Sequence, residues 1–424
     1  MLTLNDLDTK GKTVFLRCDI NCPIDDESGD IIDDSRIEEV VLTIKELIGS
    51  KLVIASHQGR PGKKDFISLR KHSEIISRLV GREIKFVEDI CGDLAKDSIK
   101  SMKDGDIILL DNLRFDEEEN NQVSIEEAIQ SKLVKNLSPY IDICVLDAFS
   151  TAHRSTPSIV GFPTIIPSCA GKIVQREVDA LSKIVNIPNA QFTVITGGAK
   201  IPDRLAAITK LLEANKVHKV CLGGKIGNAF LVAKNLIESK NAFSEYTIDE
   251  EENKEHYNVE YAKKAKANDE KAINGARKLL EDYPDKIELP IDYGAEVDEK
   301  RADFDISAIQ ETHRVFDIGP KTIEKYSTII NNSQNIFITG PLGWFENKEF
   351  AKGTMEILRK ISTSTAKSIT SGGHLSAAVE QLDIKNNIDH VSTAGGALIT
   401  FISGKKLPLL EALEISQNKF RDSD

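Results

Sequence analysis

Arginines that follow short apolar, strand-like runs are concentrated in the first half of this chain. Because the planar guanidinium group can bind phosphate or carboxylate through two hydrogen bonds, a group of arginines suits a small anion that carries several charges. Any one of them could simply pair with one of the 67 acidic residues, but several at equivalent positions favour a shared anion site. The arginines are Arg17, Arg36, Arg60, Arg114 and Arg154.

Gly-Gly pairs follow such runs only in the second half, after residue 190. Glycine between a strand and a helix lets backbone N–H groups and the helix dipole approach a phosphate chain, although a single pair would be weak evidence because glycine serves any tight turn. Lys200 adds a positive charge beside the first pair, where a transferred phosphoryl group would need compensation. The four pairs, which predict a nucleotide site, are Gly197-Gly198, Gly223-Gly224, Gly372-Gly373 and Gly395-Gly396.

Other polar side chains accompany the arginines. Asp19 and Asn21 lie on a turn after the first apolar run, and both can accept a hydrogen bond from a hydroxyl group, which arginine cannot. Ser35 begins a predicted capping box with Glu38, which puts Arg36 in the first turn of an amphipathic helix with its guanidinium free to meet a ligand. The first half is therefore predicted to bind a compact anionic substrate.

The segment 340–346 is a rigid turn that carries an aromatic side chain and a carboxylate, Trp344 and Glu346. These suit packing beside a nucleoside and bonding of ribose hydroxyls, although the tryptophan could equally belong to the core. Neither G-x-x-x-x-G-K-[ST] nor G-x-G-x-x-G occurs, so neither a P-loop enzyme nor a standard dinucleotide binder is indicated.

Bulk properties limit the class of protein. A length of 424 residues suits two domains, and a formal net charge of −12 argues against bulk binding to nucleic acid or to an anionic membrane. No run of about 18 or more apolar residues occurs. The six cysteines lack the spacing of a structural zinc site and suit a reducing compartment. We therefore expect a cytoplasmic protein.

Short apolar runs alternate with segments of helical period along the chain. Such alternation implies an α/β fold with parallel sheets covered by helices, and ligands bind at the carboxyl ends of the strands in such sheets. A helical pattern over 173–185, followed by Pro188, predicts a helix that connects the two halves. The runs are 13–16, 51–55, 106–110, 141–146, 192–196, 218–222, 286–289, 335–339, 367–370 and 390–393.

Seven segments, in this order, resemble motifs of the phosphoglycerate kinase family, and the resemblance spans nearly the whole chain. It implies two Rossmann-like domains joined by a connecting helix and hinge: residues 1–170 with the tail 404–424, the helix 171–190, and residues 191–403. The segments are RCDINCP (17–23), SHQGRP (56–61), LLDNLRF (109–115), LDAFSTAHR (146–154), GGAKIPDR (197–204), GPLGWFE (340–346) and HVSTAGGA (390–397).

The resemblance also implies the substrates and their binding residues. ATP and 3-phosphoglycerate would be the substrates of a monomer or homodimer, with Mg²⁺ held through the nucleotide phosphates and no metal site in the protein itself. The residues implied for 3-phosphoglycerate are Asp19, Asn21, Arg36, His57, Arg60, Arg114 and Arg154. Those implied for ATP or ADP are Gly198, Ala199, Lys200, Arg204, Gly224, Pro341, Gly343, Glu346, Gly372, Gly373, His374 and Leu375. Those implied for the transfer step are Arg36, Lys200, Arg204, Gly372 and Gly395.

The acceptor in this reaction would be a carboxylate, which is already ionised at neutral pH. The site would need no general base, and its task would be to bring two anions together and neutralise their charge. Closure of the two domains would exclude water, which could otherwise take the phosphoryl group.

Three positions depart from the family pattern. Arg204 stands where a second lysine is common, Thr339 where an asparagine is usual before Gly-Pro, and His374 where an aspartate is associated with the metal-nucleotide. These departures suggest a divergent, archaeal branch. His374 also favours a second hypothesis, a relative that binds phosphoglycerate or nucleotide without turnover, whereas the complete set of arginines and Lys200 oppose it. A nicotinamide dehydrogenase would fit the α/β alternation but lacks the fingerprint.

Overall fold

The computed structural model describes residues 1–25, 27–185, 191–243, 259–298, 300–310, 312–392 and 394–420. The chain divides into two units, Met1–Asp179 with Lys405–Asp424, and Ala180–Gly404. The division lies within helix α7 (Lys172–Val185), in the segment predicted to connect the two halves. Residues 186–190 of that predicted segment, and 421–424 of the predicted tail, lie outside the described residues.

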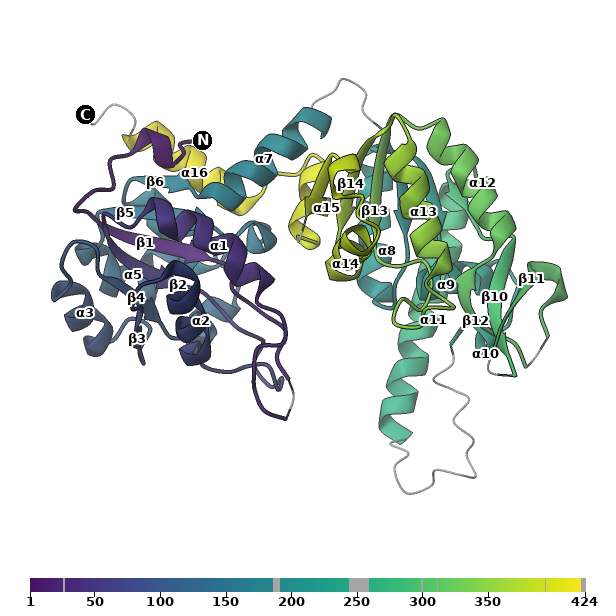
Figure 1. Cartoon of the computed structure of the whole chain (residues 1–424), viewed down its shortest axis with the longest axis horizontal. Helices are drawn as coiled ribbons and strands as arrows, with labels where there is room; N and C mark the ends of the chain where they lie inside the picture. Colours follow the sequence, from purple (N-terminus) through teal and green to yellow (C-terminus); the bar gives the residue numbers. More distant parts are fainter. Residues whose placement is uncertain are drawn as a thin grey trace. The chain divides into compact units, whose positions relative to one another are not determined.

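The first unit has one parallel sheet with the strand order β3-β4-β2-β1-β5-β6 and helices against it (Figure 1). Its central strands are buried along nearly their whole length, as expected of strands that helices cover on both faces. The strands are β1 (Thr13–Cys18), β2 (Lys51–Ala55), β3 (Lys85–Val87), β4 (Ile107–Leu110), β5 (Ile143–Asp147) and β6 (Ser168–Ala170). The helices are α1 (Ser35–Glu46), α2 (Arg70–Val80), α3 (Asp93–Lys100), α4 (Ile125–Gln130), α5 (Lys132–Leu137), α6 (Pro157–Val160) and α16 (Pro408–Phe420).

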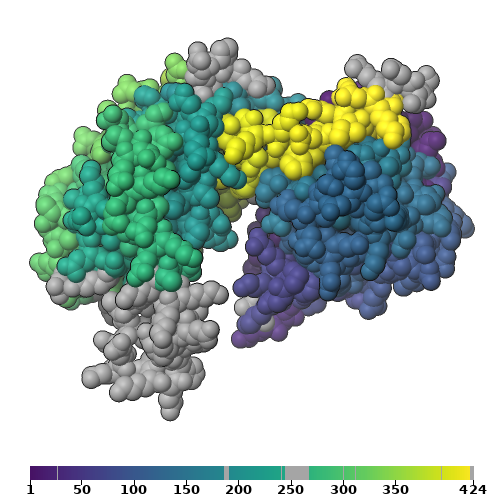
Figure 2. Space-filling view, turned by 180° about the vertical axis from the view of Figure 1, so that it is seen from behind, coloured from purple at the N-terminus to yellow at the C-terminus, as the bar shows by residue number. Residues whose placement is uncertain are grey.

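Helix α16 returns to the first unit from the end of the chain. Its Ser416 hydroxyl accepts a hydrogen bond of 2.8 Å from the backbone of Ser168 in β6, and Lys419 Nζ donates to the carbonyl of Thr164 at 2.9 Å. Figure 2 shows this segment, in yellow, lying along the blue surface of the first unit.

The second unit is built on another parallel sheet, with the order β15-β14-β13-β7-β8-β9. Its strands are β7 (Phe192–Thr196), β8 (Val217–Leu222), β9 (Ile287–Glu288), β13 (Asn335–Thr339), β14 (Lys367–Ser371) and β15 (His390–Ser392). Its helices are α8 (Ile201–Glu213), α9 (Gly224–Ala233), α10 (Ser239–Ala242), α11 (Val259–Asp282), α12 (Pro320–Asn331), α13 (Lys352–Thr363), α14 (Gly373–Gln381) and α15 (Gly396–Ile402).

The predicted α/β class with parallel sheets is confirmed, and every predicted run overlaps a strand. A third sheet, which was not predicted, is antiparallel and has the order β11-β10-β12. Its strands, β10 (Asp292–Val297), β11 (Lys300–Asp305) and β12 (Arg314–Ile318), mix charged and apolar residues, and β11 is largely solvent-exposed. They therefore lack the continuous apolar runs on which the prediction depended.

Asp147, at the end of β5, fastens the start of α7 to the sheet. Its Oδ1 accepts hydrogen bonds from the backbone of Ile173 at 2.8 Å and Val174 at 3.0 Å, and its Oδ2 accepts one from the Thr43 hydroxyl. Burial raises the pKa of Asp147 to about 6, although these bonds favour the carboxylate. Since this pKa lies above that of an unfolded chain, the folded state retains a proton that the unfolded state loses, and stability falls as pH rises from about 4 to about 6.

Replacing Asp147 by asparagine is expected to remove that pH dependence. The amide keeps an oxygen for the two backbone donors and offers its nitrogen to Thr43, but it cannot ionise. In urea unfolding at a series of pH values, the variant should gain stability relative to wild type between about pH 4 and 6, with no further gain above about pH 7. A difference in stability between the variant and the wild type that does not change with pH would contradict the role given to this carboxyl group.

Candidate active site

The polar residues of the first unit follow four neighbouring strands. In the order β4-β2-β1-β5, each strand is parallel to the next, so the loops at their carboxyl ends meet at one edge of the sheet. Asp19 and Asn21 follow β1, His57 and Arg60 follow β2, Arg114 follows β4 and Arg154 follows β5; Arg36 lies in the first turn of α1. The predicted capping box is wrong, because Asp34 precedes the helix and no side-chain bond caps it.

Side-chain amides fasten these loops to one another. Gln58 Oε1 accepts from the backbone of Cys22 at 2.9 Å, and Asn112 Oδ1 accepts from the backbone of Gln58 at 3.1 Å. Asn21 Oδ1 accepts from the backbone of Gly59 at 2.8 Å. Asn21 therefore holds two loops together with the oxygen that was expected to meet a hydroxyl group.

Arg36 and Asp19 form an ion pair, with 2.6 Å between Nη1 and Oδ2. Asp19 also accepts hydrogen bonds from the Ser150 hydroxyl and from the backbone of Asn21. Burial acts to raise the pKa of Asp19, but the Arg36 guanidinium and the hydrogen bonds from Ser150 and the Asn21 backbone outweigh it, so that the pKa lies below its usual value and the group is a carboxylate. The expectation that the Arg36 guanidinium would be free is wrong, because Asp19 binds it.

The remaining cations of this edge lie close enough to repel one another. Burial, together with the positive charges of Arg154, Arg17 and Arg60, lowers the pKa of Arg114 to about 10. Burial likewise lowers the pKa of Arg154, with Arg60 and Arg17 acting in the same direction and Asp19 against them. The excess of positive charge at this edge therefore favours an anionic ligand.

His57 and Arg17 differ from the other members of this group. Burial is the largest cause that holds the pKa of His57 well below its usual value; Asp19 opposes it, and Arg17, Arg114 and Arg154 add to it, so the imidazole is neutral. Arg17 is buried, donates from Nε to Ser158 Oγ at 2.8 Å, and lies 3.9 Å from the Glu119 carboxylate. The side chain of Arg17 is thus bonded to other side chains of the protein, and we interpret it as a structural support of the cluster.

The second unit contains a cavity of about 840 Å³ beyond the carboxyl ends of its parallel strands. All of the residues that the family resemblance implied for ATP or ADP line it, whereas Gly197, Gly395 and Gly396 of the predicted Gly-Gly pairs do not. The lining residues so assigned are Gly198, Ala199, Lys200, Arg204, Gly224, Pro341, Gly343, Glu346, Gly372, Gly373, His374 and Leu375.

Glycine is required where two loops of this cavity press together. A Cβ atom on Gly197 would lie 2.0 Å from the carbonyl oxygen of Pro341, so no side chain fits there. Gly372, just before α14, has φ +110° and open space where a Cβ atom would stand, so its requirement is conformational. These positions let backbone approach whatever occupies the cavity.

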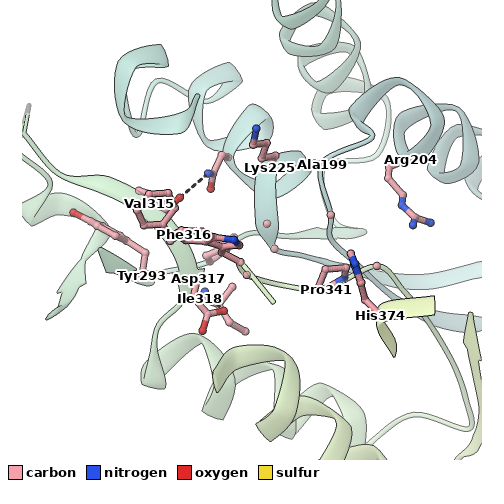
Figure 3. A pocket seen from close by; sticks show the side chains of 18 of the residues that line it. Ala199, Arg204, Lys225, Tyr293, Val315, Phe316, Asp317, Ile318, Pro341 and His374 are labelled. Atoms are coloured by element: carbon pink, nitrogen blue, oxygen red, sulfur yellow. Dashed lines mark hydrogen bonds between the residues drawn. The ribbon is translucent and has the colours of Figure 1, made fainter. Parts of the chain in front are cut away.

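Several lining residues were not identified from the sequence. They come from α9, α10 and the antiparallel sheet, and they add aromatic and apolar side chains, with some charged ones, to one end of the cavity. Figure 3 shows Tyr293 and Val315 on one side of the cavity and Arg204 and His374 on the other. The alternation of apolar and polar residues in DYGAEV could have indicated β10, whereas RVFDI does not alternate. The lining residues missed include Asn228, Tyr293, Val315, Phe316 and Asp317.

Each departure from the family pattern has a partner within the cavity wall. Arg204 Nη1 donates to Thr339 Oγ1 at 2.5 Å, so two departures bind each other. His374 Nε2 lies 3.4 Å from Glu346 Oε1, and its ring stacks on Phe345 with 5.6 Å between the centroids. The cavity thus has a cationic, glycine-rich end beside an aromatic one.

The described residues contain no group of three or more His, Cys, Asp or Glu side chains that could hold a metal ion. Within the same part of the chain, no helix is long and apolar enough to cross a membrane.

An α/β protein with a cluster of cations on one unit and a glycine-lined cavity on the other has the construction of a phosphotransferase. The model of the family described as Phosphoglycerate kinase matches residues 4–405. A phosphoglycerate kinase of Thermococcus kodakarensis is 38% identical over 428 residues, covering 100% of this chain and 99% of that relative. One of Methanothermus fervidus is 38% identical over 420 residues, covering 98% of each.

Among solved structures, the phosphoglycerate kinase of Pyrococcus horikoshii superposes with a TM-score of 0.85 at 36% identity, covering 99% of this chain and 100% of that one. The chain belongs to the phosphoglycerate kinase family, and its function is ATP-dependent phosphoryl transfer.

Proposed function

We propose that the chain transfers a phosphoryl group reversibly between ATP and the carboxylate of 3-phosphoglycerate, giving ADP and 1,3-bisphosphoglycerate. The observation that carries this proposal is the cluster of mutually repelling guanidinium groups on the first unit. Arg60, Arg114 and Arg154 bind the phosphate of the acid, and neutral His57 donates or accepts one further hydrogen bond. The ionised Asp19 accepts a hydrogen bond from the hydroxyl group of the substrate.

The nucleotide lies in the cavity of the second unit. Its phosphates meet the backbone N–H groups near Gly198 and Gly372 and the cations of Lys200 and Arg204, and its base meets the aromatic end. Glu346 bonds the ribose. Gly395 does not line the cavity, so it remains a candidate only for binding the phosphoryl group during its transfer.

Mg²⁺ fits this arrangement as a partner of the nucleotide. It would be held mainly by the nucleotide phosphates, which Lys200, Arg204 and the backbone near Gly198 and Gly372 would orient. When bound, it would supply charge neutralisation for the phosphates. The residues themselves orient the phosphates and exclude water.

A cytoplasmic location belongs to the same proposal. All six cysteines are buried and unpaired, as suits a reducing compartment. The choice between monomer and homodimer stays a prediction.

Asn228 provides a way to recognise the base. Its Nδ2 donates to the carbonyls of Ala242 and Val315, both at 3.3 Å, and the residue lines the cavity. Because two carbonyl oxygens face this nitrogen, turning the amide over would set oxygen against oxygen. Oδ1 is therefore left as an acceptor, which suits the amino group of adenine and opposes the carbonyl that inosine carries at the same place.

We expect kcat/KM for ATP to exceed that for ITP by roughly 10- to 100-fold. In Asn228→Ala, whose melting temperature is checked in parallel, this ratio should fall toward one, since the selective acceptor is gone. Equal use of the two nucleotides by the wild type would show that Asn228 only supports α10 and β12.

Turnover itself is tested with purified protein, ATP, Mg²⁺ and 3-phosphoglycerate, with formation of the acyl phosphate followed by a coupled dehydrogenase. Rapid turnover that requires Mg²⁺ and both substrates supports the proposal. Measurable binding of both ligands without turnover would instead favour the non-catalytic relative.

A further inference from the structure

Arg204 is a cation with few partners in a largely buried position. It lies in the first turn of α8 and lines the cavity, and its Nε is buried without a hydrogen-bond partner. Burial lowers the pKa of Arg204, and the neighbouring Asp203 opposes that effect. A buried N–H donor of a charged group that lacks an acceptor is costly unless a ligand supplies one.

The one side-chain hydrogen bond found for Arg204 among the described residues is the bond of Nη1 to Thr339 Oγ1, at 2.5 Å. On the other side of the guanidinium, Nη2 lies against Gly340, where an added Cβ would be 3.1 Å away. The hydroxyl and the bare glycine backbone together restrict where the planar group can sit.

Thr339 is itself held firmly. It is the last residue of β13 and pairs with Thr196 of β7, whose hydroxyl donates to the Thr339 carbonyl at 3.0 Å. The residue is buried, and its branched side chain has few rotamers available. Its hydroxyl is therefore a fixed acceptor, whereas an arginine side chain alone is flexible.

We propose that Thr339 is a positioning residue that fixes the Arg204 guanidinium, so that Nε and Nη2 remain as paired donors for oxygens of the nucleotide phosphate chain. This inference rests on the proposed function, which assigns Arg204 to the phosphates. This inference links the two departures from the family pattern. The planar guanidinium group can donate two parallel hydrogen bonds, from Nε and Nη2, which a lysine ammonium group cannot, and the threonine hydroxyl accepts the hydrogen bond from Nη1.

The proposal is tested by calorimetric titration of the whole chain with ADP and, separately, with adenosine, which has the base and ribose but no phosphate. The variants are Thr339→Val, Thr339→Ser, Arg204→Met and the double variant Thr339→Val/Arg204→Met. Thr370→Val is the matched control, because Thr370 is a buried threonine of the adjacent strand β14 whose hydroxyl has no hydrogen-bond partner. Melting temperatures are measured for all of them.

Arg204→Met should weaken ADP binding roughly tenfold, and Thr339→Val roughly three- to tenfold although it keeps the charge. Thr339→Ser, which keeps the hydroxyl, should bind ADP as the wild type does, and so should the control. The double variant should bind no more weakly than Arg204→Met alone, because the threonine acts only through the arginine. Adenosine should bind all variants equally.

Loss of ADP affinity in Arg204→Met but not in Thr339→Val would overturn the positioning role and leave the proposed function intact. Losses that multiply in the double variant, or a parallel loss of adenosine affinity, would overturn it too, since they indicate independent effects or a distorted cavity. Unchanged ADP binding in Arg204→Met would instead remove Arg204 from the proposed phosphate site.

Discussion

Replacing Arg154 by methionine is expected to raise KM for 3-phosphoglycerate roughly 100-fold and, at the same time, to raise the melting temperature of the unliganded protein by about 1–3 °C. The two effects have one cause. Burial and the neighbouring cations Arg60 and Arg17 lower the pKa of Arg154, so without an anion its charge is unfavourable, and with an anion it becomes a donor of charged hydrogen bonds. Methionine keeps the aliphatic volume and removes the charge.

The control for this prediction is Arg70→Met. Arg70 is more than half exposed and pairs with Glu88 at 2.8 Å, so its removal changes the net charge of the protein equally without touching the cluster. Neither KM nor melting temperature should rise. A second readout is ligand protection: 3-phosphoglycerate should raise the melting temperature of the wild type and of Arg70→Met but scarcely that of Arg154→Met. A lower melting temperature for unliganded Arg154→Met would contradict the repulsion argument.

The same trade-off explains why positive charges are tolerated at this edge of the sheet. Selection for binding can keep groups that destabilise the unliganded fold, provided that the rest of the domain compensates. Asp19 shows how compensation is arranged, since it pairs with Arg36 and also opposes the lowering of the pKa of Arg154.

The sequence was sufficient to predict the parallel sheets, because strands buried on both faces appear as continuous apolar runs. It was also sufficient to predict that Asp19, His57, Arg114 and their neighbours lie at one edge of the first sheet, because the carboxyl ends of parallel strands share an edge. The edge strands β3 and β6, with the sequences KFV and SCA, were not predicted, because a lysine and small residues leave no continuous apolar run there.

What could not be predicted depends on contacts between distant residues. No spacing rule indicates that Asp19 binds Arg36 or that the Asn21 side-chain oxygen accepts a hydrogen bond from Gly59. The same is true of the hydrogen bond between Arg204 and Thr339, which are 135 residues apart in the sequence. The sequence of a polar strand such as β11 does not indicate an antiparallel sheet either. Because that sheet was not predicted, the aromatic residues that it contributes to the cavity were not predicted. These features arise from tertiary packing, which local sequence patterns do not contain.

Replacing Lys200 by alanine is expected to lower kcat by about 100- to 1,000-fold while the Kd for ADP changes less than about threefold. Lys200 lies immediately before α8, its side chain is exposed, and it lines the cavity beside Gly198 and Ala199. Arg36→Ala is expected to lower kcat comparably from the first unit, since both cations are assigned to the phosphoryl group in transfer. The measurements are steady-state kinetics and calorimetric titration on the same preparations.

The split between rate and binding follows from when the charge appears. ADP lacks the phosphoryl group in transfer, so a cation that acts on that group contributes little to ADP affinity and much to the barrier. Lys210→Ala is the control, because Lys210 is an exposed residue in the last turn of the same helix and should leave kcat unchanged. A near-normal kcat in Lys200→Ala, or a loss of ADP affinity in proportion to the loss of rate, would contradict this role. The charge of the phosphoryl group in transfer would then have to be compensated by the backbone N–H groups at Gly198 and Gly372 instead.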